Sequence, residues 1–322
     1  MRQFGIAVAA ALAAVTLLAL TAGLAGHSPA EVLRVLAEGA MGSPYAVRST
    51  ILRSVPLLLT GLSVVLAFRA GALNIGGEGQ FIVGALAALL TARFGVIASI
   101  AAAAVAGAAW ASVATLMRLW RNAPEVLTTI LLNFVAIHLL GWAVNGPLRE
   151  ASGQYPQSDR ATVELPLVAG THAGVMVAVL AAIGLWWLLY RTSEGLRLRA
   201  TGFNPSAAQW AGISPGAQLA RAMAISGALA GTAGGIELLG VTHRLFERFA
   251  AGHGYSGIAV ALLAQLHPIA AAASALFFGA LATGAGELQR SLEVSSAIAV
   301  FAQAVVILVV IAFTRRSGSD RA

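Results

Sequence analysis

Long apolar runs alternate with short polar breaks along the chain, and the lengths of these runs predict membrane-spanning helices. A helix needs about 20 residues to cross a bilayer. The pattern predicts about ten transmembrane segments, with both chain ends on the cytoplasmic side, at residues 4–24, 49–68, 81–92, 96–117, 124–144, 168–190, 216–240, 255–266, 270–285 and 294–313. Two segments, 81–92 and 255–266, are too short to span in regular form, which is typical of broken or half helices. The predicted fold class is all-α, a polytopic helical membrane protein in which residues 1–322 form a single transmembrane domain.

The first apolar run and the longest polar insertion complete this outline. The run at 4–24 exceeds the hydrophobic region of a secretory signal peptide, and Arg2 is the only charge before it. An uncleaved helix is therefore favoured over a signal peptide. Residues 146–167 carry mixed charges and several Pro residues, and they are predicted to form an exposed loop on the outer side.

A glycine-rich polar stretch at 70–80, AGALNIGGEGQ, interrupts the apolar pattern. Backbone without regular hydrogen bonds is tolerated at membrane depth only where it is buried in protein or lines a wet cavity. Asn74, Glu78 and Gln80 would be costly against lipid, so we expect them to face inward and to be candidates for a solute pathway. For Glu78 there is a structural alternative, in which its carboxylate accepts hydrogen bonds from backbone N–H groups of the broken helix.

Two polar residues in apolar segments are further pathway candidates. Asn133 follows Thr129 by four residues, so both lie on one face of their predicted helix. Hydrogen bonding between helices explains this pair as well as a contact with a solute does. Glu237 lies near the outer end of its segment, and it is either a pathway carboxylate or the ion-pair partner of Arg244 or Arg248.

The glycine-rich break has a faint echo later in the chain. The stretch NIGGEGQFIVGALAALL at 74–90 resembles AAGHGYSGIAVALLAQL at 250–266, because each is a break followed by a short apolar helix. The predicted topology places the two breaks on opposite sides of the membrane, as inverted repeats do around a central pathway. In a chain this rich in Ala, Gly and Leu, chance similarity is the alternative to an inverted repeat.

The stretch at 191–215 is polar and rich in Arg, unlike the apolar sequence around it, and it is predicted to be a cytoplasmic loop that carries a short helix. Asn204 is a favourable N-cap, Pro205 suits the first helical position and Gly212 can end a helix, so a helix of about two turns is predicted. Helices shorter than about 12 residues are marginal in water, so this one needs a surface on which to dock. Its Arg residues indicate the cytoplasmic side. The surface is either a partner protein or the chain's own helical bundle.

Composition supports a membrane protein and excludes several functions. Of the 322 residues, 58% are hydrophobic and only 10% are charged, and the mean hydropathy is +0.83. The net charge of +7 comes from Arg without any Lys, which excludes an ordinary P-loop ATPase, since that loop needs Lys on the phosphates. The chain has no Cys, so Cys-ligated metal and thiol chemistry are excluded. Its Arg residues are scattered at segment ends, where lipid headgroups explain them, so nucleic-acid binding is not expected.

No catalytic motif stands out in the sequence. The six His residues lack the spacing of a zinc-protease motif, and there is no G-x-S-x-G elbow. We therefore expect neither enzyme activity nor a cofactor or metal in this chain. A helical bundle without a power source is a channel or an externally powered transporter, and the docked helix favours the transporter.

Four stretches resemble a known family of membrane proteins. They are FRAGALNIGGEGQFIVGA (68–85), PEVLTTILLNFVAIHLLGWAVNGPL (124–148), GLRLRATGFNPSAAQWAGI (195–213) and GALAGTAGGIELLGV (227–241). Through them, about residues 50–313 are similar to the membrane-spanning permeases of bacterial ATP-binding-cassette importers, in the branch for simple sugars, branched-chain amino acids and nucleosides. Within that branch the chain most resembles guanosine and purine-nucleoside uptake permeases that work with lipoprotein receptors of the basic-membrane-protein type.

The resemblance implies partners and a coupling site. In the family, the segment that matches 195–213 is the coupling helix, which sits in a cleft of the ATPase subunit. The residues that this assigns to ATPase coupling are Arg199, Gly202, Asn204, Pro205, Ala208, Gln209, Trp210 and Gly212. The implied partners are a cytoplasmic ATPase that binds ATP and Mg, a second permease, an outer substrate-binding lipoprotein and membrane lipid. The second permease is a different chain in the nucleoside branches, and an identical one is the alternative. The implied location is the bacterial cytoplasmic (inner) membrane, crossed several times.

The expected function is therefore the membrane-spanning subunit of an ATP-driven importer, coupled to its ATPase through the helix at 204–212. The expected solute is small and polar, with a nucleoside favoured, since amides and carboxylates suit ribose hydroxyls and base edges. The family loop often carries Lys or another polar residue where this chain has Arg or Ala, which puts in doubt which ATPase is matched. Three alternatives stay open: a sugar or other solute, a passive solute channel, and an assembly or signalling subunit in the membrane.

Overall fold

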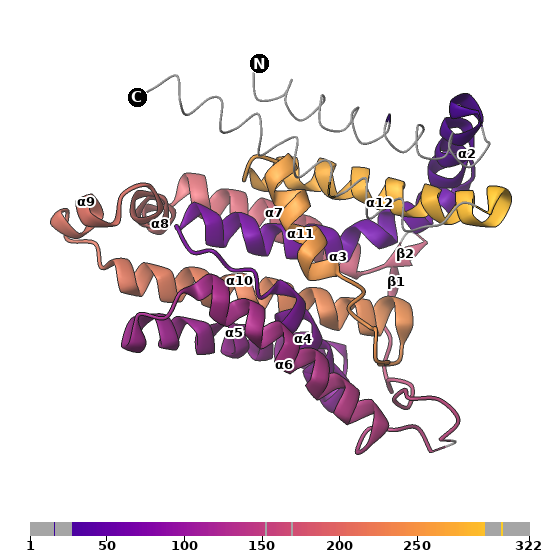
Figure 1. Cartoon of the computed structure of the whole chain (residues 1–322), viewed down its shortest axis with the longest axis horizontal. Coiled ribbons are helices and arrows are strands. Elements are labelled where there is room, and N and C mark those ends of the chain that lie inside the picture. Colours follow the sequence, from indigo (N-terminus) through magenta and orange to yellow (C-terminus); the bar gives the residue numbers. More distant parts are fainter. Residues whose placement is uncertain (1–15, 17–27, 152, 169, 294–303, 305–322) are drawn as a thin grey trace. The chain divides into compact units, whose positions relative to one another are not determined.

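The computed structural model describes residues 16, 28–151, 153–168, 170–293 and 304, and most of these residues are helical (Figure 1). The α-helices are α2 (Pro29–Met41), α3 (Pro44–Arg69), α4 (Gly77–Thr91), α5 (Val96–Arg121), α6 (Glu125–Asn145), α7 (Gly174–Arg191), α8 (Ser193–Phe203), α9 (Pro205–Trp210), α10 (Pro215–Glu237), α11 (His253–Leu263) and α12 (Pro268–Leu292). A 3₁₀ turn at Ala92–Phe94 follows α4, and a π-helix at Leu238–Thr242 extends α10.

The described residues include six helices that are long and apolar enough to cross a membrane. They are α3, α5, α6, α7, α10 with its π-helical extension, and α12. Their positions confirm the predicted helical segments between residues 49 and 285, although their ends differ by several residues. The shorter helices α4 and α11 lie where half helices were predicted. The predicted segments at 4–24 and 294–313 fall almost entirely outside the described residues, so a total of ten stays a prediction.

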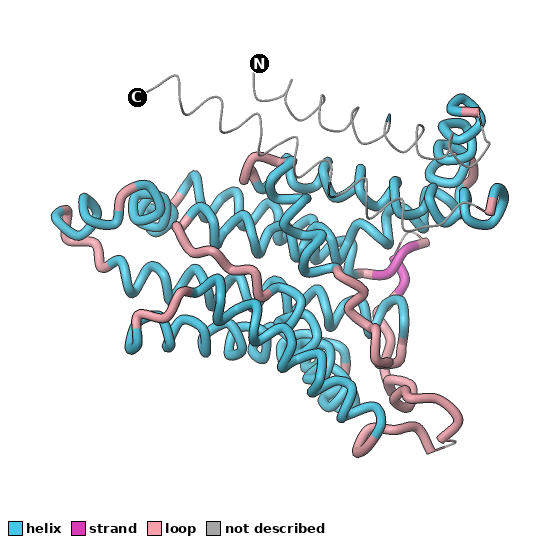
Figure 2. Tube along the Cα trace, viewed as in Figure 1, coloured by secondary structure: helices cyan, strands magenta, loops and turns pink. Residues whose placement is uncertain are grey.

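Strand structure is a minor addition to this helical fold. Strands β1 (Leu167–Val168) and β2 (Thr171–His172) form an antiparallel pair in which Leu167 faces His172. They follow the polar insertion at 146–167, which is drawn mainly as loop in Figure 2. The mostly helical content confirms a polytopic helical protein as the fold class.

The chain divides into two compact units. Unit 1 comprises Met1–Ser54 and Ala259–Ala322, and unit 2 comprises Val55–Ile258. In unit 1, α2 packs against α12. A side chain at Gly284 of α12 would overlap the backbone of Leu36, so this small residue lets the two helices approach closely.

Unit 2 is organised around α10, which packs against α4 and α5. Added side chains at Gly227 and Gly231 would overlap the α5 backbone, and one at Gly234 would overlap the carbonyl of Phe81 in α4. Small residues at such spacing let helix backbones touch, which is how membrane helices pack without a hydrophobic driving force. The glycines of α10 thus allow its backbone to lie in direct contact with α4 and α5.

Helices α5, α6 and α7 turn large apolar side chains outward. Val105 of α5, Leu131 of α6 and Leu180 of α7 are all exposed. A protein in water rarely shows so continuous an apolar exterior, whereas lipid tails accept it without cost. The outer faces of these three helices are therefore suited to a bilayer.

Candidate functional site

The break between α3 and α4 is shorter than the sequence predicted. The chain leaves the helix after Arg69 and becomes helical again at Gly77, so only 70–76 are irregular (Figure 2). The prediction of 70–80 was wrong at its end, because the N–H of Gln80 already donates to the carbonyl of Gly76 at 3.0 Å. Glu78 and Gln80 therefore lie in the first turn of α4.

Asn74 and Gln80 hold the irregular backbone by pairing their side-chain amides. Asn74 Nδ2 donates to Gln80 Oε1 at 3.0 Å, and Gln80 Nε2 donates back to Asn74 Oδ1 at 3.0 Å. Asn74 Oδ1 also accepts from the N–H of Gly76 at 2.9 Å, and Asn74 Nδ2 donates to Ser226 Oγ of α10 at 2.8 Å. Both amides are buried and face inward as predicted.

Asn133 of α6 forms hydrogen bonds to the same part of the backbone from another side. Its Oδ1 accepts from the N–H of Gly79 at 2.8 Å, and its Nδ2 donates to the carbonyl of Ile75 at 2.9 Å and to the Tyr255 hydroxyl at 3.1 Å. Thr129 lies on the same face, and its hydroxyl accepts from the N–H of Ile75 at 3.3 Å. These contacts favour hydrogen bonding between segments over direct solute contact for this pair.

Glu78 joins the first break to the second. Its Oε1 accepts from the N–H of Gly252 at 2.8 Å, and its Oε2 accepts from the N–H of Gly254 at 2.8 Å. The side chain is only 5% exposed. The carboxylate is thus a backbone acceptor, as the structural alternative proposed, but the N–H groups belong to the start of α11 and not to its own helix. The ring of Phe81 stacks on His253 beside this contact, with centroids 5.4 Å apart.

The N-terminal ends of α4 and α11 therefore meet. A side chain at Gly254 would overlap the backbone of Gly77 and Glu78. The first break follows the end of α3, where Gly71 touches Gly202 of α8. The second follows the connection after α10, in which Phe246 forms a β-bridge with Gln157 of the 146–167 insertion. The backbone before the first break thus contacts α8, whereas the backbone before the second contacts the 146–167 insertion. The placement of the two breaks on opposite sides of the membrane stays a prediction, and so does the inverted repeat.

Sequence reasoning missed several members of this polar network. Ser226 donates to the carbonyl of Ser63 at 2.8 Å while it accepts from Asn74, and nothing in its small-residue surroundings signalled this role. Tyr255 could have been suspected as the one phenol at the start of a predicted half helix. The indole Nε1 of Trp110 is buried near Gly79 and has no hydrogen-bond partner among the described residues.

Glu237 lies apart from the break, at the last residue of α10. It is almost fully buried, and its carbonyl accepts from the hydroxyl of Thr242 in the π-helical extension at 3.3 Å. Arg244, one of its two expected ion-pair partners, pairs with Glu150 at 2.5 Å. A pathway role for Glu237 stays a prediction.

Helix α9 has the capping that the sequence predicted. Asn204 Oδ1 accepts from the N–H of Ala207 at 3.0 Å, and Pro205 occupies the first helical position. At the other end Gly212 has a φ of +77°, its N–H donates to Gln209 at 3.0 Å, and the N–H of Ile213 donates to Ala208 at 3.0 Å. This pair of bonds is a Schellman motif, in which a left-handed glycine satisfies the last carbonyls of a helix.

Two aromatic side chains at the two ends of α9 are not covered by the described residues. Trp210 is 92% exposed, and Phe203, immediately before the N-cap, is 93% exposed. Gln209 is also exposed, whereas Ala208 is buried and seats the helix on the rest of the chain. Sequence reasoning missed Phe203, although an aromatic residue beside a predicted N-cap was a usable signal.

Two predicted coupling residues face inward instead. Gly202 packs against the backbone at the end of α3, where any side chain would overlap the carbonyl of Arg69. The guanidinium of Arg199 lies over the ring of Tyr190, 5.1 Å from its centroid. Within the described residues these contacts hold α8 against the end of α3 and against Tyr190, and a coupling role for Gly202 and Arg199 stays a prediction.

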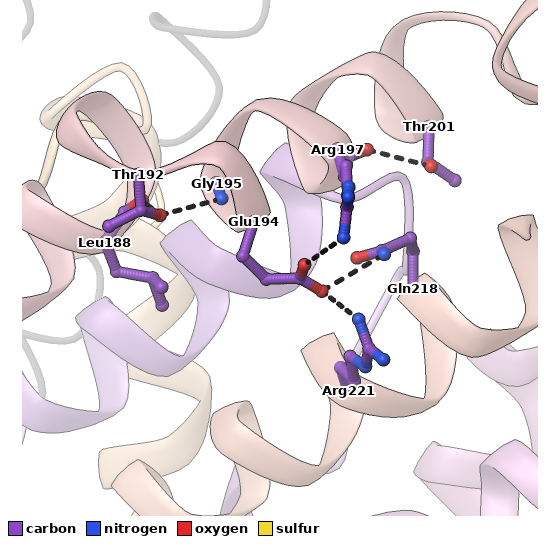
Figure 3. Close-up of polar contacts among 8 residues, drawn as sticks. All are labelled: Leu188, Thr192, Glu194, Gly195, Arg197, Thr201, Gln218 and Arg221. Carbon is purple, nitrogen blue, oxygen red and sulfur yellow. Dashed lines mark hydrogen bonds and ion pairs between the residues drawn. The ribbon is translucent and has the colours of Figure 1, made fainter. Parts of the chain in front are cut away.

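Helix α8 lies where the sequence predicted a loop, and it is joined to α10 through one carboxylate (Figure 3). Thr192 caps it by accepting from the N–H of Gly195 at 3.0 Å. Glu194 Oε2 accepts from Arg197 of the same helix at 3.2 Å. Glu194 Oε1 accepts from Gln218 Nε2 of α10 at 3.1 Å and from Arg221 of α10. We call these four residues, Glu194, Arg197, Gln218 and Arg221, the Glu194 cluster.

Comparison with known proteins gives a consistent result. The family model described as "Branched-chain amino acid transport system / permease component" matches residues 46–314. The chain is 33% identical to the guanosine ABC transporter permease protein NupP of Bacillus subtilis, over 95% of this chain and 91% of that protein. It is 32% identical to the glucose ABC transporter permease protein TsgB13 of Haloferax volcanii, over 88% and 80%. It is 27% identical to the guanosine ABC transporter permease protein NupQ of Bacillus subtilis, over 72% and 79%. No solved structure matches the chain.

Proposed function

Since the chain belongs to the family of branched-chain amino acid transport system permease components, we propose that it carries a nucleoside across the membrane in an ATP-driven importer. The family establishes the coarser part of this statement. The chain is a non-catalytic, multi-pass permease subunit of the inner membrane, in an ABC importer for nucleosides or sugars. Such permeases work with an ATPase and a substrate-binding protein.

The choice of a nucleoside rests on the extent of one match. The guanosine permease NupP is similar over 95% of this chain, compared with 88% for the glucose permease TsgB13, at nearly equal identity. Glucose is the second candidate because of that second match.

The test is uptake of radiolabelled guanosine and radiolabelled glucose by proteoliposomes that hold the chain with its partner subunits. ATP-dependent guanosine uptake supports the proposal, and uptake of glucose alone refutes it.

The second permease is proposed to be a different chain. Bacillus subtilis has two guanosine permease proteins, NupP and NupQ, and this chain is similar to both, at 33% and 27% identity. A pair of related but distinct permeases for one solute fits a heterodimer. Purification of the tagged chain from its own host tests this composition: a second permease in equal amount supports a heterodimer, and a single permease species supports a homodimer.

Coupling to the ATPase is proposed to occur through α9. The carrying observation is that a fully capped helix of 6 residues ends in an uncovered Trp210 and is preceded by an uncovered Phe203. Large exposed aromatic side chains on a short helix are typical anchors of a protein interface. The proposed anchors are Phe203, Gln209 and Trp210, while Asn204, Pro205, Ala208 and Gly212 build and seat the helix. ATP and Mg are proposed to bind to the ATPase, with no cofactor in this chain.

The pathway is proposed to pass the meeting point of α4 and α11. The side chains of Asn74, Gln80 and Asn133 form hydrogen bonds that hold the break, and Glu78 is bound to the start of α11. We propose that they fix the shape of the broken segments and exchange partners when the pathway opens. Irregular backbone held in this way lines the substrate routes of many transporters.

Replacement of Trp210 by Ala tests the coupling role. The side chain is exposed, so the variant should fold and insert normally, but it should lose about tenfold or more of ATP-dependent uptake, because a central aromatic anchor contributes about 2 kcal/mol or more to binding. The exposed Trp120→Ala on α5 is a matched control, and it should transport normally. Unchanged uptake in Trp210→Ala would refute the coupling role. Solute flux without any ATPase would instead support a channel.

A further inference from the structure

The Glu194 cluster connects α8 with α10. Helix α8 leads into α9, and α10 contacts the first break through Ser226. Its carboxylate has one ligand on α8, Arg197, and two on α10, Gln218 and Arg221 (Figure 3). Glu194 and Arg221 are 27 residues apart in sequence, so the cluster is a cross-link between elements and not a local turn. One side chain therefore fixes the first turn of α8 against the first turns of α10.

Other contacts of α8 lead elsewhere. Thr192 donates to the carbonyl of Leu188 at 2.6 Å, and Gly195 packs on the same backbone, so the start of α8 is anchored to α7. An open cavity of about 290 Å³ beside α9 is lined by residues such as Gly71, Arg118 and Pro205.

Helix α10 leads from the cluster to the first break. Gln218 and Ser226 are eight residues apart on this helix, a rise of about 12 Å. Ser226 accepts from Asn74 Nδ2 at 2.8 Å, and Asn74 organises the break. The helix between them is buried against α4 and α5 and has a regular backbone, so a displacement at Gln218 is carried to Ser226 as a rigid-body shift.

The Glu194 cluster contributes little to stability, which makes a mechanical role the better explanation for it. The Glu194 side chain is 30% exposed and that of Arg221 is 54% exposed. Ion pairs at such exposure contribute little to the free energy of unfolding. Within the described residues, the Oε1 of Gln218 is buried without a hydrogen-bond donor, so the cluster in this arrangement leaves one acceptor that a shifted arrangement could satisfy.

We propose that Glu194 is a positioning residue that makes α8 and α10 move as one body, so that displacement of α9 by the ATPase reaches Asn74 and the first break. This inference rests on the proposed function, because it takes α9 to be the element that the ATPase moves. Loss of the carboxylate charge should leave ATP hydrolysis in place and separate it from solute movement.

The first test measures transport and hydrolysis together in proteoliposomes holding the chain, its second permease, the ATPase and the receptor, with guanosine and glucose as probes. In Glu194→Gln, the amount of solute imported per ATP hydrolysed should fall about tenfold, a typical size for coupling between two sites. The charge exchange Glu194→Arg with Arg221→Glu should recover part of this ratio. Glu164→Gln, which breaks a similarly exposed ion pair with Arg160 in the outer insertion, should leave the ratio unchanged.

The second test needs neither solute nor ATP. The chain has no Cys, so Leu196→Cys on α8 and Ala217→Cys on α10, both exposed, accept spin labels without background. The distance distribution between the labels should be narrow in the native background and broader with Glu194→Gln. An equal width in both backgrounds, or an unchanged import ratio, overturns the role of Glu194. If the native complex imports neither probe with ATP, the proposed function fails instead, and the label distances still decide whether the two helices are joined.

Discussion

At the scale of single residues, buried amides replace backbone hydrogen bonds that the broken helix lacks. Asn133 satisfies the N–H of Gly79 in the first turn of α4 and the carbonyl of Ile75 in the first break, and Asn74 satisfies the N–H of Gly76. In a bilayer no water is available to replace a missing partner, so each such group would otherwise cost several kcal/mol. The polar residues that looked like solute ligands in the sequence thus have a structural function that can be measured.

Replacement of Asn133 by Ala should lower the free energy of unfolding by about 2–6 kcal/mol. It leaves the N–H of Gly79 and the carbonyl of Ile75 buried without partners, and each costs about 1–3 kcal/mol. Asn145→Ala on the same helix is the matched control, since Asn145 is exposed and water can replace its contacts. Thermal unfolding in detergent measures both variants, and equal losses would contradict this role of Asn133.

The pKa of Glu194 gives a pH-dependent prediction. Partial burial acts to raise this pKa, but the hydrogen bonds from Gln218 and Arg221 and the charge of Arg221 outweigh it, so the pKa lies below the usual value of 4.5. A lowered folded-state pKa means that the stabilisation is fully present above the pKa of the unfolded chain and is lost as pH falls through the folded-state pKa.

The stability difference between the native chain and Glu194→Gln should therefore be constant from about pH 7 to about pH 5 and should disappear only below the ordinary glutamate range. The difference itself should be about 1 kcal/mol or less, because the pair is partly exposed. Thermal unfolding in detergent at a series of pH values measures it. A difference that vanished near pH 6 would indicate a raised pKa and would contradict the assignment.

At the scale of elements, the meeting of α4 and α11 depends on glycine. The N–H groups at the start of α11 point at the Glu78 carboxylate, a favourable arrangement because the start of a helix carries partial positive charge. Gly254 has no side chain, and this lets the two helix ends come into backbone contact. The element that shapes the candidate pathway is therefore a joint between two half helices and not a single broken one.

Replacement of Gly254 by Ala should separate these helix ends and reduce transport more than stability alone explains. The new methyl group would overlap the backbone of Gly77 and Glu78, and such overpacking costs about 1–3 kcal/mol. Gly141→Ala on α6 is the control, because nothing lies near its added methyl group. Uptake and thermal unfolding are compared for both. Native uptake by Gly254→Ala would show that the close contact is dispensable.

At the scale of the whole molecule, elements that depend on neighbouring residues could be predicted from the sequence. Contacts between residues far apart in the chain could not. The caps of α9 depend on Asn204, Pro205 and Gly212, which are neighbours in sequence, so the helix was predicted correctly. The bond between Glu78 and Gly254 joins residues 176 positions apart, and no periodicity reports such a contact. Helix α8 was missed because its Arg residues and Gly195 resemble a cytoplasmic loop, although Thr192 offered a cap.

Helical spacing could predict only some of the contacts that the candidate site residues form. The sequence could place Asn133 and Thr129 on one face, because helical spacing determines that. It could not show that both are bonded to Ile75, since the path of the break depends on packing against α6 and α10. Gly202 and Arg199 were assigned by resemblance, and only the three-dimensional contacts turned them toward α3 and Tyr190.

The uncovered aromatic rings beside and on α9 have a consequence for how the protein is made. With α9 docked on a cytoplasmic ATPase, as proposed, a permease made without that ATPase would expose Phe203 and Trp210 to the cytosol, where chaperones and proteases act on exposed hydrophobic surface. Subunits made in unequal numbers would thus leave orphan chains marked for removal. The cell would hold the amount of permease to the amount of its ATPase by degradation.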